Sequence, residues 1–269
     1  MARIAMSKLN VDKLQEGLRT KRLGRKIFFS HEIGSTNSWA KELALLGAEE
    51  GTVAVAETQM AGRGRLEGVW VSPKGGLYFS VIFRPELTPT QATKLVFVAG
   101  LAVAEALHEL YCLKTETKWP NDVLVNRRKV CGILAEMNTT DDSVNFVLVG
   151  IGINANFDTK NALTQELWED TTSLENELDK RVQLDALFRA VVERLECIYE
   201  LFLEEGFALV LREWKKHAGF LGCKVKAVSD AEEWVGRALD VGDDGALTIE
   251  LEDGTVKSIL VGDVSLRLK

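Results

Sequence analysis

The sequence predicts an α+β protein, with a mixed and mostly antiparallel sheet flanked by helices and a small C-terminal β-barrel. Three observations lead to this fold class. Strand-like segments follow one another through tight turns, a few long apolar helical patterns lie between them, and the last stretch of about 47 residues alternates with period two. The 269 residues, 46% of them hydrophobic, suffice for one or two domains without disulfide staples.

The first third of the chain is expected to hold two helices, two strands and one loop. A short helix is expected over residues 10–20. A second helix begins at Ser35-Thr36-Asn37, whose polar side chains can cap it, and ends at Gly47. Strands are expected over residues 52–58 and 77–84. Between these strands, residues 59–76 contain five glycines and are predicted to form a mobile loop.

The middle of the chain is expected to contain one long helix and four strands. Thr88 can cap a helix over residues 88–111, and Leu95, Val98, Ala102, Ala106 and Leu110 form its apolar stripe. Strands are predicted over residues 115–118, 122–125, 130–137 and 145–153, the second and third joined by a hairpin at Asn126-Arg127-Arg128.

Two helices and the barrel complete the prediction. Helices are expected over residues 181–205 and 207–217, separated by Gly206, and four to five short strands over residues 223–269 with a hairpin at Asp253-Gly254. We therefore expect an N-terminal extension over residues 1–24, a main domain over residues 25–220 and a barrel domain over residues 221–269.

Composition excludes several classes of protein. Lys and Arg total 33 against 40 Asp and Glu, a net charge of −7, which disfavours nucleic acid as the main partner. The four cysteines form no C-x-x-C pair, which argues against a zinc site, and free thiols fit a reducing cytoplasm. The most apolar stretch, residues 96–104, is too short to span a membrane, and we expect neither a membrane partner nor a signal peptide.

Glycines and arginines alternate in the loop segment 59–65. Gly62 and Gly64 let the backbone come close to a ligand, and the planar groups of Arg63 and Arg65 suit carboxylate or phosphate. A solvated surface loop can have the same composition, so this segment alone leaves both interpretations open.

A second candidate is Lys118-Trp119-Pro120-Asn121-Asp122. Pro120 forces a turn that sets a cation and a carboxylate four residues apart. Lys118 could neutralise phosphate oxygens and Asp122 could hold Mg²⁺, although a surface ion pair at a turn would have the same sequence.

Lys129 stands at the start of the apolar strand that contains Gly132 and Leu134. Strict alternation places Lys129 on the opposite face from those two residues, so a ligand shared by all three requires a twist or bulge in the strand. A basic hairpin tip is the alternative. The segments around Lys118–Lys129 and the glycine-rich loop are both locally positive, which suggests an anionic ligand such as a nucleoside polyphosphate.

The segment Gly150-Ile151-Gly152-Ile153-Asn154-Ala155 matches the dinucleotide pattern G-x-G-x-x-A, but we reject that interpretation because a turn, not a helix, follows it. Gly150, Gly152 and Asn154 share one face of a strand. The two missing side chains would leave room there for a flat ligand, with Asn154 as a polar contact; a bulge or a close helix–sheet approach is the alternative.

Taken in order, these segments resemble the signatures of the biotin protein ligases, as do the residues Trp70 and Gly132-Ile133-Leu134-Ala135-Glu136. The resemblance covers residues 25–269 and implies a class II synthetase-like catalytic domain followed by an SH3-like barrel. It implies ATP-dependent activation of biotin to biotinyl-5′-AMP, with Mg²⁺, and transfer of biotin to a lysine of a biotin carboxyl carrier protein. A homodimer is left open.

The resemblance also implies roles for individual residues. Lys129, Arg63, Lys118 and Asp122 would be catalytic, with Asp122 serving magnesium or orientation. The biotin site would comprise Ser35, Thr36, Asn37, Gln59, Arg63, Gly64, Arg65, Gly132, Leu134, Gly150 and Gly152. The nucleotide site would comprise Arg65, Trp70, Lys118, Asn121, Lys129, Asn154 and Trp168.

Several alternatives remain beside this hypothesis. A lipoate or octanoate protein ligase or transferase of similar fold is the first, and a non-catalytic nucleotide-binding module is another. A biotin-responsive DNA-binding repressor is disfavoured, because only 34 residues precede Ser35 and we expect the type without a helix-turn-helix domain. The loop also departs from the family pattern: Leu66-Glu67-Gly68 replaces Arg-Gly-Arg, so we expect a weaker hold on biotinyl-AMP.

Overall fold

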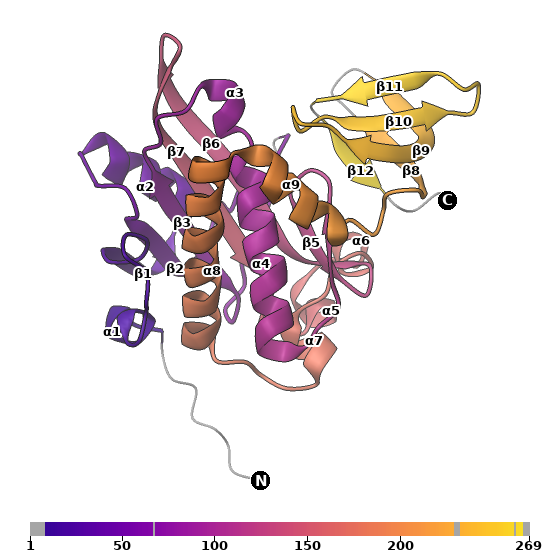
Figure 1. Cartoon of the computed structure of the whole chain (residues 1–269). Helices are drawn as coiled ribbons and strands as arrows, with labels where there is room; N and C mark the ends of the chain where they lie inside the picture. Colours follow the sequence, from indigo (N-terminus) through magenta and orange to yellow (C-terminus); the bar gives the residue numbers. More distant parts are fainter. Residues whose placement is uncertain (1–8, 67, 229–231, 261, 266–269) are drawn as a thin grey trace.

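A seven-stranded sheet forms the centre of the protein (Figure 1). The structure is a computed structural model that describes residues 9–66, 68–228, 232–260 and 262–265. The strand order is β1-β2-β3-β7-β6-β5-β4, and every neighbouring pair is antiparallel except β1 with β2. The strands are β1 (Ile27–Ile33), β2 (Val53–Gln59), β3 (Leu77–Phe83), β4 (Thr115–Lys118), β5 (Asp122–Val125), β6 (Arg128–Thr140) and β7 (Ser143–Ile153).

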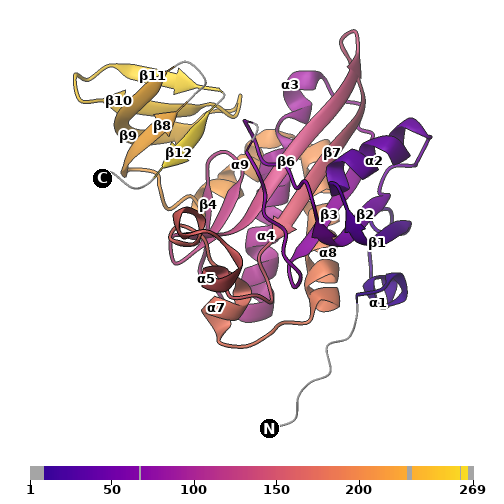
Figure 2. The ribbon, with the colours of Figure 1, turned by 180° about the vertical axis from the view of Figure 1, so that it is seen from behind.

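Helices cover both faces of this sheet. The long helices α4 (Leu95–Tyr111), α8 (Leu184–Glu205) and α9 (Phe207–Lys216) lie together on one face (Figure 1). Helix α2 (Thr36–Leu45) packs on β2, β3 and β7 from the other face, visible in Figure 2. The shorter helices are α1 (Val11–Gln15), α3 (Pro89–Ala92), α5 (Thr159–Ala162), α6 (Gln165–Trp168) and α7 (Leu174–Leu178).

The C-terminal part of the chain forms a separate five-stranded antiparallel sheet with the order β11-β10-β9-β8-β12 (Figure 1). Its strands are β8 (Lys224–Val228), β9 (Glu233–Val241), β10 (Leu247–Leu251), β11 (Val256–Ile259) and β12 (Asp263–Ser265). The indole of Trp119 donates a hydrogen bond of 2.9 Å to the carbonyl of Gly245, which ties the two sheets together. The predicted α+β class, with a mixed sheet and a C-terminal β domain, is confirmed.

Several details of the predicted elements were wrong: the first helix is shorter than expected, the short helices α5, α6 and α7 were not predicted, and three further differences concern other elements. The helix expected over residues 88–111 is interrupted: the N–H of Lys94 donates to the carbonyl of Gln91, a tighter turn that separates α3 from α4. Leu110, assigned to its apolar stripe, is 39% exposed. Strand β1 was missed; it lies at an edge of the sheet, and its half-exposed residues show no clear alternation.

The stretch Pro89–Tyr111 is long and apolar enough to cross a membrane, a test that the core helix of a folded domain also passes. In this protein, 67% of its most apolar window is buried inside the fold. Most of this stretch is helix α4, which packs against α8, α9 and the sheet. Burial in the core therefore accounts for its apolar composition.

Candidate active site

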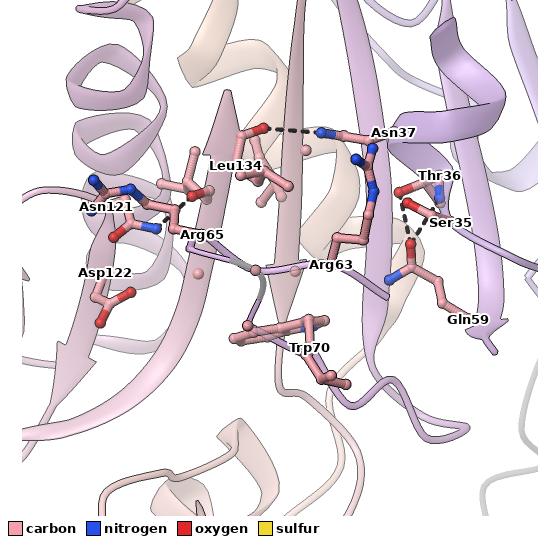
Figure 3. Close-up of a pocket in the computed structure, with 18 of the residues that line it drawn as sticks. Ser35, Thr36, Asn37, Gln59, Arg63, Arg65, Trp70, Asn121, Asp122 and Leu134 are labelled. Atoms are coloured by element: carbon pink, nitrogen blue, oxygen red, sulfur yellow. Dashed lines mark hydrogen bonds between the residues drawn. The ribbon is translucent and has the colours of Figure 1, made fainter. Parts of the chain in front are cut away.

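A cavity of about 260 Å³ lies on the face of the sheet that carries α2 (Figure 3). The start of α2, the end of β2, the glycine-rich loop, and strands β5, β6 and β7 all contribute to its wall. The lining includes Ser35, Thr36, Asn37, Gln59, Arg63, Gly64, Arg65, Trp70, Asn121, Asp122, Lys129, Gly132, Leu134, Gly150 and Gly152. The fold thus brings fifteen of the eighteen candidate residues to one cavity.

One end of the cavity is lined by a hydrogen-bonded set of neutral polar groups. The backbone N–H and the hydroxyl of Thr36 donate to Oε1 of Gln59, at 2.8 and 3.1 Å. The Gln59 amide in turn donates to the Ser72 hydroxyl at 2.8 Å, and the buried Ser80 hydroxyl lies 2.6 Å from Oδ1 of Asn37. Ser35 occupies the N-cap of α2, but its side chain makes no capping hydrogen bond. Its hydroxyl therefore remains available to a ligand.

The other end contains two lysines and one carboxylate. Asp122 is buried, with its Oδ1 2.6 Å from the Lys129 ammonium and its Oδ2 3.0 Å from that of Lys118. Burial alone would raise the pKa of Asp122, but the charges of Lys129 and Lys118 outweigh it and hold that pKa below its ordinary value. Burial likewise opposes the charged form of Lys118, yet the attraction of Asp122 and Asp263 raises the pKa of that lysine. With Arg65, which both carboxylates attract, three cations face Asp122 and Asp263, so this end of the cavity carries a net positive charge.

A β-bulge places Lys129 on the same face as the cavity. Val123 pairs with Cys131, but Leu124 pairs with Lys129, so Val130 is an extra residue in β6. The alternation of side chains is reset at this point, and a Cβ added to Gly132 would lie 3.2 Å from the Lys129 ammonium. The bulge required for a shared ligand is present.

Protein side chains occupy the room that the glycines create. A Cβ added to Gly152 would lie 2.5 Å from Nε1 of Trp70, and one added to Gly132 would lie 2.8 Å from the same ring. A Cβ on Gly150 would meet the amide of Asn37 at 2.3 Å. These glycines line the cavity, and they also allow Trp70 and Asn37 to pack on the sheet, so part of the space expected on this strand face is taken up by side chains.

The two loop arginines already have partners in this structure. Arg63 donates two hydrogen bonds to the Glu136 carboxylate, at 2.9 and 2.6 Å. Arg65 donates to the carbonyl of Gly262 in the C-terminal sheet domain at 2.7 Å, and burial lowers the pKa of its guanidinium. The loop is thus fastened to the sheet at one point and to the C-terminal domain at another. Glu67, part of the unusual loop sequence, lies outside the described residues.

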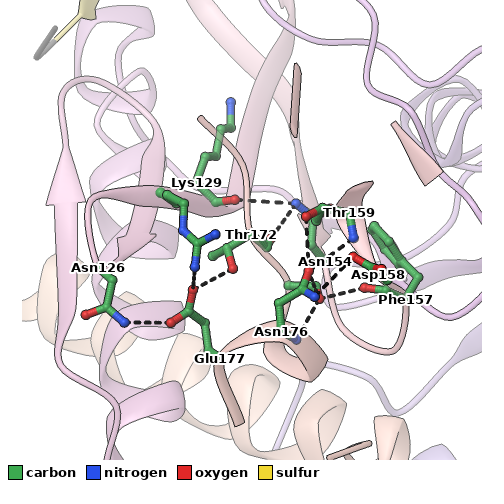
Figure 4. Close-up of polar contacts among 11 residues, drawn as sticks. Asn126, Lys129, Asn154, Phe157, Asp158, Thr159, Thr172, Asn176 and Glu177 are labelled. Atoms are coloured by element: carbon green, nitrogen blue, oxygen red, sulfur yellow. Dashed lines mark hydrogen bonds and ion pairs between the residues drawn. The ribbon is translucent and has the colours of Figure 1, made fainter. Parts of the chain in front are cut away.

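Three candidate residues do not line the cavity. Lys118 reaches it through Asp122 and Asp263, both of which line the cavity. Asn154 is buried and donates to the carbonyls of Thr172 and Lys129 (Figure 4), which is a supporting position. Trp168 is the last residue of α6, and the Lys160 ammonium lies 5.1 Å from the centre of the Trp168 ring.

Among polar and charged residues of the described chain, sequence reasoning missed four that belong to the site. Ser72 and Ser80 extend the neutral polar network, Glu136 binds Arg63, and Asp263 lines the cavity from the C-terminal domain. Of these four, only Glu136 could have been found from the sequence, because period-two alternation puts its side chain on the same face of β6 as Gly132.

A magnesium site built from protein groups is not present in the part of the chain that the structure describes, where no three His, Cys, Asp or Glu residues gather in a way that could hold an ion. Both oxygens of Asp122 face lysine ammonium groups. Its surroundings therefore suit the orientation of those lysines better than coordination of a cation.

The fold and the cavity define a class of protein that binds a small anionic ligand between a neutral polar end and a cationic end. Residues 30–154 match the biotin/lipoate A/B protein ligase family, and residues 220–267 match the biotin protein ligase C-terminal domain. The chain belongs to the biotin protein ligases. It is 34% identical over 260 residues to the bifunctional ligase/repressor BirA of Bacillus subtilis, covering 96% of this chain and 79% of BirA.

Further relatives are similar to this chain in sequence or in structure. The biotin–[acetyl-CoA-carboxylase] ligase of Paracoccus denitrificans is 33% identical, over 80% of this chain and 90% of its own length. The biotin protein ligase of Aquifex aeolicus, solved in complex with biotin and ATP, superposes with a TM-score of 0.77 and 31% identity, over 91% of this chain and all of that chain. The biotin protein ligase of Leishmania major, solved in complex with biotinyl-5-AMP, superposes with a TM-score of 0.61 and 26% identity, over 87% of this chain and 98% of that chain.

Proposed function

We propose that this protein is an ATP-dependent biotin–protein ligase. It activates biotin to biotinyl-5′-AMP and then transfers biotin to a lysine of a biotin carboxyl carrier protein. Membership of the family and the relatives solved with biotin and ATP support this activity. The observation that carries it here is the single cavity in which the neutral polar network and the Lys118–Asp122–Lys129 group meet.

The neutral polar end is suited to the ureido ring of biotin. That ring presents N–H donors and a carbonyl acceptor, and Ser35, Thr36, Asn37 and Gln59 offer both kinds of partner. Because Gln59 and Thr36 are already bonded to one another, their orientation is set before a ligand arrives. Preorganised polar groups lower the cost of ordering side chains on binding.

The cationic end is suited to the adenylation step. In that step an oxygen of the biotin carboxylate attacks the α-phosphorus of ATP, and the bond to pyrophosphate breaks. Two anions must approach, so fixed positive charge where negative charge develops lowers the barrier. We assign this task to Lys129 at this end, held in place by Lys118 and Asp122, and to Arg63, which lies beside Asn37 because both donate to Glu136. Arg65 and Asn121 border the nucleotide side.

The transfer step needs no protein nucleophile. The lysine amine of the carrier attacks the carbonyl of the mixed anhydride, an amide forms, and AMP leaves with the bonding electrons. The thiol nearest the cavity is Cys131, which is buried, and burial raises the pKa of this thiol far above its ordinary value. It is therefore held in its unreactive protonated form.

Several finer assignments belong to the same proposal. Magnesium enters with the nucleotide, as part of the MgATP substrate, because phosphate oxygens and water supply most Mg²⁺ ligands in such sites. All four cysteines are free, which fits a reaction in the cytoplasm. We retain residues 25–220 as the catalytic domain and 221–269 as the barrel domain, of which residues 229–231, 261 and 266–269 lie outside the described residues.

The test is label transfer. The protein is incubated with ATP, Mg²⁺, labelled biotin and a carrier domain, and label on the carrier is measured after denaturation. We expect transfer from biotin, loss of transfer without ATP, and at least a tenfold slower rate in Lys129→Ala. Labelled lipoate in a parallel reaction is the matched control. Transfer of lipoate in place of biotin would contradict the proposal.

A further inference from the structure

A buried carboxylate outside the cavity joins the hairpin that precedes Lys129 to a distant segment that lies beside Lys129. Glu177, on α7, has a side chain that is only 4% exposed. It accepts hydrogen bonds from Asn126 at 2.6 Å, from Arg128 at 2.7 Å and from the Thr172 hydroxyl at 2.5 Å (Figure 4). Two of these donors belong to the β5–β6 hairpin immediately before Lys129, and the third belongs to a segment far along the chain.

That distant segment supplies the backbone partners of Lys129. The N–H of Lys129 donates to the carbonyl of Asp170 at 2.8 Å, and the N–H of Thr172 donates to the carbonyl of Lys129 at 2.9 Å. A parallel bridge joins Lys129 and Thr171. Pairing between β6 and β7 begins only at Cys131, so residues 170–172 take the place of a neighbouring strand beside Lys129.

We propose that Glu177 is a positioning residue for Lys129, acting through the hairpin and through residues 170–172. This inference rests on the proposed function, since it assigns Lys129 a task in adenylation. Glu177 is not among the residues that line the cavity, and its carboxylate bonds to Asn126, Arg128 and Thr172, not to the Lys129 ammonium. Its carboxylate is the point at which Asn126, Arg128 and Thr172 meet, and charge-assisted hydrogen bonds of this kind are stronger than neutral ones.

The side chain of Lys129 depends on this arrangement for its direction. Its ammonium lies 2.6 Å from Asp122 and 5.1 Å from the centre of the Trp70 ring, so a small shift of the backbone would move it away from both. A reacting group displaced by about 1 Å can lose a hundredfold in rate. Loss of Glu177 is therefore expected to slow adenylation more than it weakens biotin binding, because the polar end of the cavity is untouched.

Glu196 provides a matched control. It is also a buried carboxylate with three donors, the backbone N–H groups of Lys21, Arg22 and Leu23, at 2.6 to 2.9 Å. These contacts join α8 to the N-terminal segment and none of them lines the cavity. Glu196→Gln therefore reports what the loss of such a carboxylate does to stability alone. Thr172→Val, which removes one donor from Glu177 at constant shape, is a milder second variant.

The first measurement is amide hydrogen exchange of the full-length protein without ligand. We expect Glu177→Gln to speed exchange at Lys129 and Thr172 at least about tenfold, Thr172→Val to speed it less, and Glu196→Gln to leave it unchanged. Unchanged protection at Lys129 and Thr172 in Glu177→Gln would overturn the proposal. This readout does not depend on the activity of the protein.

The second measurement is biotin-dependent exchange of pyrophosphate into ATP, made below the melting temperature of every variant. We expect kcat to fall about tenfold in Glu177→Gln while KM for biotin changes less than about threefold. Equal losses in Glu177→Gln and Glu196→Gln would assign Glu177 a structural role only and overturn the inference. If the wild-type protein shows no exchange, the proposed function fails, whereas hydrogen exchange still decides the position of Glu177.

Discussion

Lys118 and Lys129 share one carboxylate, that of Asp122, at 3.0 and 2.6 Å. The two lysines come from different strands, and the bulge in β6 is what lets them meet. Lys118 also lies 3.7 Å from Asp263, and the guanidinium of Arg65 is attracted by both carboxylates, so three cations face two anions and a surplus positive charge remains. That surplus is available to an anionic ligand, while Asp122 holds the direction of both ammonium groups.

Replacement of this carboxylate is expected to destabilise the protein. In Asp122→Asn, two lysines lose their common partner while their side chains remain only 17% and 30% exposed. We expect a loss of about 2 kcal/mol in the free energy of unfolding at pH 7, between the values typical of exposed and of fully buried ion pairs. Urea unfolding measures it, and Asp253→Asn, at an exposed turn, is the control. An equal loss in both variants would contradict the assignment.

The same substitution makes a pH dependence testable. The pKa of Asp122 is lower in the folded protein, so its contribution is present above the unfolded value of about 3.9 and is lost as the pH falls through the folded value. The pKa of Lys118 is raised, so its contribution is present below about 10.4 and is lost as the pH rises through the folded value. The difference between wild type and Asp122→Asn should be constant from about pH 5 to 9 and shrink at both extremes. A difference that is largest at pH 3 would contradict this.

Arg63 is expected to contribute directly to ligand affinity. Its guanidinium binds Glu136 through two hydrogen bonds, which shows that the loop can present it to a carboxylate. A charge-assisted hydrogen bond contributes about 1.5–3 kcal/mol, so Arg63→Ala should bind biotinyl-5′-AMP at least tenfold more weakly. Calorimetry can measure this, with Arg212→Ala on α9 as the control. Equal affinities for the two variants would remove Arg63 from the site.

Trp70 is expected to report ligand binding by its fluorescence. Its indole Nε1 is buried and has no hydrogen-bond partner among the described residues, and its ring lies on Gly132 and Gly152. A ligand that enters the cavity must change these surroundings. We expect biotin to alter the tryptophan emission and Trp70→Phe to abolish most of that change, whereas Trp234→Phe in the C-terminal sheet keeps it. A full signal in Trp70→Phe would contradict this position.

The unusual loop sequence can be tested at one position. Leu66 is exposed and already has a positive φ of 48°, so arginine fits there as well as leucine does. At Gly68 an added Cβ would lie 2.8 Å from the carbonyl of Arg65, so restoration of arginine at that position is sterically strained. We expect Leu66→Arg to slow dissociation of biotinyl-5′-AMP several-fold relative to Leu66→Gln. Equal dissociation rates would show that this loop cation does not hold the adenylate.

Most of the helices and strands could be predicted because their burial is regular. Strands β2, β3 and β7 and helices α8 and α9 follow clear patterns of apolar residues. The break between α3 and α4 is a local tightening of the backbone, and β1 is a half-exposed edge strand, so neither leaves a periodic signal.

The candidate residues could be chosen by residue type, but their arrangement could not. Alternation along β6 separated Lys129 from Gly132, and only the pairing of β5 with β6 shows the bulge that reunites them. The packing of Trp70 on two glycines is a contact between segments about 60 and 80 residues apart, which no local pattern records. The support from Glu177 has the same origin, because its three partners lie in two separate parts of the chain.

The most direct test of the central claim is exchange of labelled pyrophosphate into ATP, because it isolates activation of the carboxylate in this cavity from the later transfer. We expect exchange that requires biotin and that falls at least tenfold in Lys129→Ala, while Arg127→Ala at the exposed hairpin tip retains it. Exchange that does not require biotin, or that survives unchanged in Lys129→Ala, would contradict the account.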